Sequence, residues 1–153
     1  MCVFQPRHVI VAPAIFVTGT VNRKELQSLA EARLKDAQTL FDHGRFDGAY
    51  YLAGYAIECA LKACIAKKTK RHDFPDKDFA HNVYTHDVST LLRLSGLESE
   101  LRSQFRTEPK LEARWGVVKG WNEKSRYGKQ GRKTGHDAVA HPEGVLACLR
   151  RFW

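Results

Sequence analysis

The residues best suited to binding or catalysis lie in a short basic segment, residues 124–136. Three glycines interrupt this segment, and no acidic residue occurs in it. Five cationic side chains precede a single histidine: Lys124, Arg126, Lys129, Arg132, Lys133 and then His136. A guanidinium group binds phosphate oxygens in pairs, and an imidazole accepts or donates a proton near neutral pH. The basic segment therefore has the groups needed to bind phosphate and, with its histidine, to cleave RNA without a metal.

The sequence leaves three interpretations of the basic segment open. It is a solvated loop without a ligand, or it binds the phosphate of a nucleotide or of RNA, or it also cleaves RNA. In the binding case, Lys129 and Lys133 join Arg126 as phosphate ligands. In the catalytic case, we expect Arg126 or Arg132 to neutralise the phosphate and His136 to carry the proton. The formal net charge of +8 favours a polyanionic partner such as RNA or a nucleotide.

A second polar constellation lies within residues 46–66, a stretch that is apolar on nearly every side. Tyr51, Tyr55, Glu58 and Lys62 are separated by four, three and four positions, which places them on one face of a helix. A carboxylate in such surroundings needs a partner, because losing its hydration alone is costly. Either Glu58 pairs with Lys62 one turn away, or it makes a buried polar contact that fixes a second helix or a ligand. Both residues are therefore candidates for ligand binding.

The sequence does not support metal or cofactor chemistry. The pairs His81/His86 and His136/His141 are each five residues apart, a spacing that does not place two metal ligands on one helical face. The four cysteines show no CxxC spacing and indicate reduced thiols in a cytosolic protein. We therefore expect no metal site and no cofactor.

Helices must position these residues, because helical periodicity runs from about residue 22 to the end of the chain and no strand signal competes with it. We expect the first two helices to form an antiparallel hairpin joined at Gly44, and residues 67–85 to form a loop. Pro142 either begins the last helix or bends it. The expected helices cover approximately residues 22–44, 46–66, 86–95, 97–105, 109–124 and 137–153. The sequence therefore predicts an all-α fold, an up-and-down helical bundle.

Residues 1–20 differ from the rest of the chain. They are apolar for about ten residues, but Pro13 interrupts this run, which is too short to span a bilayer. One interpretation is a signal peptide, although a small-residue cleavage pattern is missing. The interpretation that we prefer is a poorly structured extension, with Val21 as a possible alternative start, followed by a single domain over residues 21–153.

Four short motifs follow one another along residues 22–153. They are Gly44-Phe46-Asp47-Ala49, Ala56-Glu58-Ala60-Leu61-Lys62, His86-Asp87 with Leu91-Leu92, and Ser125-Arg126-Tyr127. Their types and order resemble the HEPN family (higher eukaryotes and prokaryotes nucleotide-binding domain). The resemblance implies a bundle of four or five helices, often a homodimer, and frequently encoded beside a minimal nucleotidyltransferase in a toxin–antitoxin pair. We expect no membrane partner. It also adds His86 and Tyr127 to the candidate ligand-binding residues.

Many members of that family are metal-independent ribonucleases with an Arg-x4–6-His pattern. In this chain three residues separate Arg132 from His136, and nine separate Arg126 from His136. Neither pair has the family's spacing. We therefore predict a protein that binds nucleotide or RNA phosphate through the basic segment. The alternatives are a ribonuclease toxin that uses Arg126 or Arg132 with His136, and a non-catalytic module that partners a nucleotidyltransferase.

Overall fold

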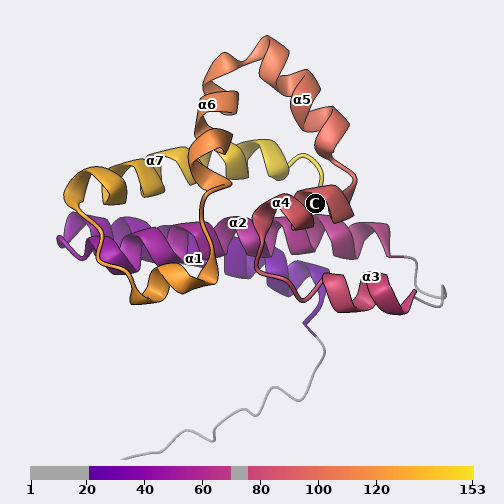
Figure 1. Ribbon diagram of the computed structural model, residues 1–153, viewed down its shortest axis with the longest axis horizontal. Coiled ribbons are helices and arrows are strands. Elements are labelled where there is room, and N and C mark those ends of the chain that lie inside the picture. Colours follow the sequence, from indigo (N-terminus) through magenta and orange to yellow (C-terminus); the bar gives the residue numbers. More distant parts are fainter. Residues whose placement is uncertain (1–20, 70–75) are drawn as a thin grey trace, which may run out of the picture.

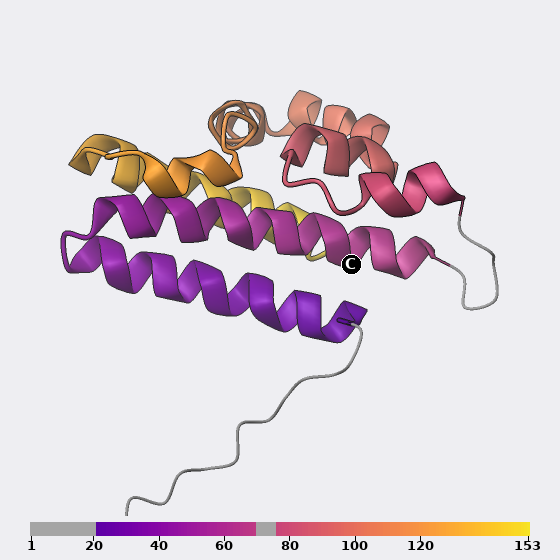
Figure 2. The same ribbon diagram turned by 60° about the horizontal axis from the view of Figure 1, so that its bottom comes forward.

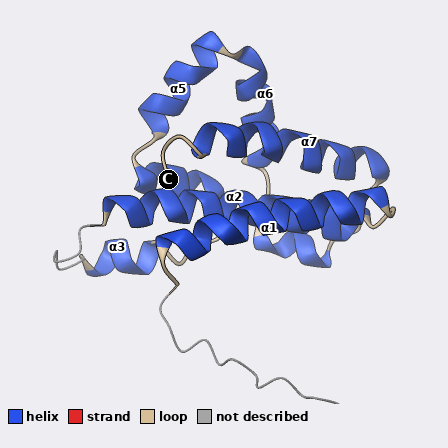
Figure 3. Ribbon diagram, turned by 180° about the vertical axis from the view of Figure 1, so that it is seen from behind, coloured by secondary structure: helices blue, strands red, loops and turns tan. Residues whose placement is uncertain are grey.

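The computed structural model describes residues 21–69 and 76–153, so the extension predicted at residues 1–20 lies outside the described part (Figure 1). Within these ranges every regular element is a helix, and Figure 3 shows no strand. The elements are α1 (Arg23–Asp42), α2 (Phe46–Lys68), α3 (Lys77–Asn82), α4 (Val88–Ser95), α5 (Glu98–Thr107), α6 (Pro109–Val118), the 3-10 helix η1 (Glu123–Tyr127) and α7 (Arg132–Leu149). The all-α prediction is confirmed, although the helices in these ranges are more numerous than expected.

Helices α1 and α2 form the expected antiparallel hairpin and run side by side (Figure 2). The Asn22 side chain accepts a hydrogen bond from the Glu25 backbone N–H at 3.1 Å, and the Glu25 carboxylate accepts one from the Asn22 N–H at 2.8 Å. This reciprocal cap satisfies two donors that a helix start leaves free. Gly44 ends the turn with a φ of +72°, a left-handed conformation that favours glycine.

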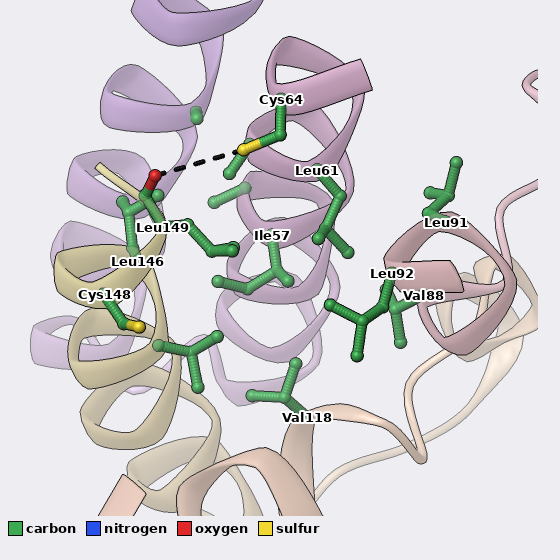
Figure 4. Packing of buried hydrophobic residues seen from close by; sticks show 14 of the residues in the cluster. Ile57, Leu61, Cys64, Val88, Leu91, Leu92, Val118, Leu146, Cys148 and Leu149 are labelled. Carbon is green, nitrogen blue, oxygen red and sulfur yellow. Dashed lines mark hydrogen bonds between the residues drawn. The ribbon is translucent and has the colours of Figure 1, made fainter. Parts of the chain in front are cut away.

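Helix α2 is the centre of the fold because α1, α4, α7 and η1 all pack on it. Ile57 and Leu61 are fully buried and meet Leu91 of α4 and Leu146 of α7 (Figure 4). The Cys64 thiol points at the Leu149 carbonyl oxygen, 4.0 Å away. Burial raises the pKa of the Cys59 and Cys64 thiols to about 11, so both stay protonated at neutral pH.

Two segments differ from the sequence prediction. Helix α3 lies within residues 67–85, which were expected to form a loop; the Asp76 side chain caps it by accepting a hydrogen bond from the Phe79 N–H at 3.3 Å. Six residues are too few to show a helical period in the sequence. Helices α5 and α6 rise from the body of the bundle as an arch that returns to α7, a feature that the periodicity did not indicate (Figure 1).

Helix α7 begins at Arg132, five positions before the expected start, and runs through Pro142 instead of beginning there. The first turn of α7 packs closely against the start of α2. A Cβ atom on Gly135 would lie 3.0 Å from the Phe46 side chain, so the glycine lets the first turn of α7 settle on the start of α2. The last part of the basic segment is therefore helical. No helix in the described ranges has the length and hydrophobicity needed to cross a bilayer.

The closest contact with α2 is made by Trp121, which is 3% exposed and lies directly over Gly54. A Cβ atom on Gly54 would lie 2.2 Å from the indole ring, well inside van der Waals contact. The glycine is thus required by packing against the tryptophan, since its own backbone is ordinary α-helix.

We predict that Gly54→Ala lowers the free energy of unfolding by about 1–3 kcal/mol, because the added methyl group displaces the buried indole. The matched control is Gly116→Ala in α6, where an added Cβ meets nothing within 4 Å. That change should be neutral or stabilising by up to about 1 kcal/mol through helix propensity. Urea denaturation of both variants provides the measurement. A Gly54→Ala protein as stable as the parent would contradict the packing argument.

Candidate functional site

The polar face of α2 extends further than the sequence indicated. Tyr51, Tyr55, Glu58 and Lys62 lie on it as expected, and Asp47 continues it one turn toward the N-terminus. Two separate segments cover this face, η1 over its first half and the α3–α4 connection over its second half. The face therefore carries two groups of residues, which are described in turn.

The second half of the face holds a buried carboxylate. Glu58 is 2% exposed, and its Oε1 atom accepts a hydrogen bond from the Lys62 ammonium at 2.7 Å. The Nδ1 atom of His86 lies 3.0 Å and 2.9 Å from the two carboxylate oxygens. Both contacts that the sequence left as alternatives are thus present together. Because His86 lies between α3 and α4, its bond to Glu58 ties that connection to the central helix.

The backbone on either side of His86 is also held. The Thr85 hydroxyl accepts a hydrogen bond from the Asp87 N–H at 3.1 Å, and the Asp87 carboxylate caps α4 by accepting one from the Thr90 N–H at 2.6 Å. Asp87 is therefore the cap of α4, and the Thr85 hydroxyl supports it by binding its backbone N–H. With Nδ1 turned inward to Glu58, the His86 side chain remains 48% exposed.

The first half of the face is covered by the basic segment. Trp121 over Gly54 fixes its beginning, and the Gln130 backbone N–H donates a short hydrogen bond to the Asp47 carboxylate further along. Between these two anchors η1 lies against α2. The basic segment is therefore attached to the bundle along its length, while its five cationic side chains remain exposed.

Arg126 and Tyr127 form an exposed pair beside α2. The Arg126 guanidinium carbon lies 4.9 Å from the centre of the Tyr127 ring, a cation–π geometry. The neighbouring Tyr127 phenol, and to a smaller extent that of Tyr51, raises the pKa of Arg126. Tyr51 in turn lies parallel to Tyr55, with an interplanar angle of 6° and a centroid distance of 6.3 Å.

His136 lies in a different environment, on the first turns of α7. Its ring meets the edge of Phe41 at a centroid distance of 5.9 Å, and its Nδ1 atom lies 3.4 Å from the Asp137 carboxylate. The four-residue spacing places Arg132 on the same face of α7 as His136. Arg132 and His136 thus lie one turn apart on α7, whereas the described neighbours of Arg126 are Tyr127 and Tyr51.

The sequence analysis missed two residues that build this site. Asp47 anchors the basic segment, and the signal was its position one turn before Tyr51, in phase with the polar face. Trp121 supports Tyr51 at a ring distance of 6.1 Å. No local sequence signal shows that Trp121 packs on Gly54.

A separate hollow of about 590 Å³ lies between α1, α2 and α3. Its walls are mainly apolar, with Leu26, Leu29, Phe79 and Val83 among them, and Glu58 and Lys62 form part of its α2 side.

The α1–α2 hairpin with an embedded Glu58–Lys62 pair, the histidine that meets it and the Arg–Tyr element together define a class of helical domain. The HEPN domain model matches residues 24–151, and the chain therefore belongs to the HEPN domain family. No curated protein and no solved structure matches the chain.

We predict that Glu58→Gln lowers the free energy of unfolding by about 3 kcal/mol, because it leaves the largely buried Lys62 ammonium without a counter-charge. The control is Glu31→Gln. Glu31 binds Arg150 through two hydrogen bonds of 2.6 Å and 2.8 Å, but both side chains are about one-third exposed. Solvent screening should limit that loss to about 1 kcal/mol or less. Equal losses in the two variants, measured by urea denaturation, would contradict a special role for the buried carboxylate.

Proposed function

We propose that this HEPN-domain protein binds nucleotide or RNA phosphate through the basic segment. The observation that carries the proposal is that its cationic side chains are exposed and that none forms an ion pair with a described acidic side chain. Charges that are not needed to balance the protein's own carboxylates are available to an anionic ligand. The two anchors on α2 support the proposal further, since they limit the conformational entropy that the segment loses on binding.

The family membership supports the proposed partners. HEPN domains often bind nucleotide or RNA and oligomerise, and on this basis we propose a cytoplasmic homodimer that pairs with a minimal nucleotidyltransferase in a toxin–antitoxin system. The Glu58–Lys62–His86 cluster is placed in this proposal as a structural support of the ligand surface. Its charges are largely used by one another, so fewer of them are free for a phosphate than in the basic segment.

The proposal predicts a strong salt dependence of binding to single-stranded RNA. If all five cations contact phosphates, log K plotted against log salt should have a slope of about −3.5. Replacing Lys129 and Lys133 together by alanine should reduce the slope to about −2. The binding constants of the parent and the variant at each salt concentration are measured by fluorescence anisotropy with a labelled oligouridylate.

The matched control replaces Lys67 and Lys68 by alanine, which removes the same charge at the opposite end of α2. This control should keep the parental slope. If both double variants change the slope equally, the binding is a general effect of net charge and the proposed site is wrong.

A second candidate function is metal-independent RNA cleavage, favoured by the spacing of Arg132 and His136 on the exposed start of α7. In this reaction the 2′-oxygen attacks phosphorus while His136 takes its proton. The 5′-oxygen then leaves with that proton, which produces a 2′,3′-cyclic phosphate and a 5′-hydroxyl end. Arg132 binds the phosphate oxygens and balances their charge.

For this candidate we predict that His136→Ala abolishes RNA cleavage by the purified protein in the presence of a chelator, and also removes growth arrest on expression. The control is His81→Ala, an exposed histidine at the end of α3. Cleavage that persists in the His136→Ala protein excludes the reaction, and the binding proposal is unaffected by that result.

A further inference from the structure

An ordered series of π systems leads from the core of the protein to its surface beside the basic segment. Trp121 is buried at 3% exposure and lies 6.1 Å from the Tyr51 ring, tilted by 39°. Tyr51 is partly buried and neighbours the Arg126 guanidinium. Arg126 covers one face of Tyr127, which is 79% exposed. The series therefore ends in an aromatic ring that faces solvent.

The folded state gains little from this last ring. A tyrosine contributes to stability mainly through the area that it buries, and Tyr127 buries only about one-fifth of its surface. Its orientation is nevertheless constrained, because Arg126 covers it and the backbone of η1 is held between the Trp121 and Gln130 anchors. A rigid aromatic ring that is exposed in this way has its stacking surface available to a ligand.

The surroundings of Tyr127 are those of a site for single-stranded nucleic acid. Lys124, Arg126 and Lys129 lie within three residues of it, and all are exposed. Sites of this kind combine cations that follow the phosphates with aromatic rings on which the bases stack. Free phosphate or polyphosphate would use the cations and leave the ring without a partner.

We propose that Tyr127 is the base-binding residue of the basic segment, so that the ligand is an unpaired nucleobase carried on phosphate, as in single-stranded RNA. This inference rests on the proposed function and specifies its ligand. The nucleobase stacks on the exposed surface of Tyr127, while Arg126 and the neighbouring lysines bind the phosphates on either side.

The test compares two labelled strands of equal charge, a 12-nucleotide oligothymidylate and an abasic deoxyribose strand with the same number of phosphates. Deoxyribose strands lack the 2′-hydroxyl group that cleavage would require, so binding is measured alone. The parental protein should bind the thymidylate strand at least about fivefold more tightly than the abasic strand. Tyr127→Ala should remove this preference while leaving the affinity for the abasic strand unchanged.

Two controls separate stacking from other effects. Tyr127→Phe keeps the ring and should keep the preference. Tyr84→Ala removes the most exposed tyrosine outside the segment, at 82% exposure in the α3–α4 connection, and should also keep it. Competition by thymidine monophosphate then shows whether the base is taken from a strand alone or also from a free nucleotide, and either result supports a nucleobase site.

The outcomes distinguish the two levels of the proposal. If both strands bind equally and with strong salt dependence, the basic segment binds phosphate and the nucleobase inference is wrong. If Tyr127→Ala weakens both strands by the same factor, the ring only positions Arg126 and the inference is again wrong. If neither strand binds in a salt-dependent way, the proposed function itself fails and the nucleobase site fails with it.

Discussion

The structure depends on a carboxylate that is buried in the middle of its central helix. Glu58 has lost almost all contact with water, and a lone ion in that position would be too costly to keep charged. Lys62 supplies the counter-charge from the same helix, and His86 supplies a second bond from a distant part of the chain. The need to satisfy one ion thus determines where the α3–α4 connection crosses α2.

In the N-terminal half of α2, shape rather than charge determines how the neighbouring segment packs on the helix. Gly54 opens a gap in the helix surface that the Trp121 ring fills, and the chain that follows can lie close to α2 from that point. Asp47 receives the same chain again at Gln130. The cations of the segment remain exposed, and none of them forms an ion pair with an acidic side chain in the described part of the chain.

Much of the fold was predictable because it follows from periodicity. The apolar pattern of residues 46–66 indicated a central helix, and the positions of Tyr51, Tyr55, Glu58 and Lys62 on one face followed from spacing alone. The local sequence pattern did not predict the helices whose bounds depend on tertiary contacts or whose length is too short for a period. Helix α3 is too short to show a period, and the first turn of α7 packs through Gly135 on Phe46, a residue far away in the sequence.

The sequence predicted which residues form the candidate site, but it did not predict which of them lie together in the structure. The basic residues were evident from the sequence, yet nothing local separates Arg126, which belongs with Tyr127 and Tyr51, from Arg132, which belongs with His136. That division follows from the start of α7 at Arg132, since the turn of the helix carries the later residues away from η1. Spacing along the chain cannot reveal it.

The bond between Asp47 and Gln130 has a consequence for how this surface can evolve. Its donor is a main-chain amide, so the attachment is indifferent to which side chain stands at position 130, with proline as the one exclusion. Neighbouring positions can therefore exchange lysine for arginine, serine or an aromatic residue while the path of the chain over α2 is preserved. The main-chain bond fixes the position of the segment, and the side chains determine what the segment binds. Ligand preference can therefore change through side-chain substitutions while the fold is kept.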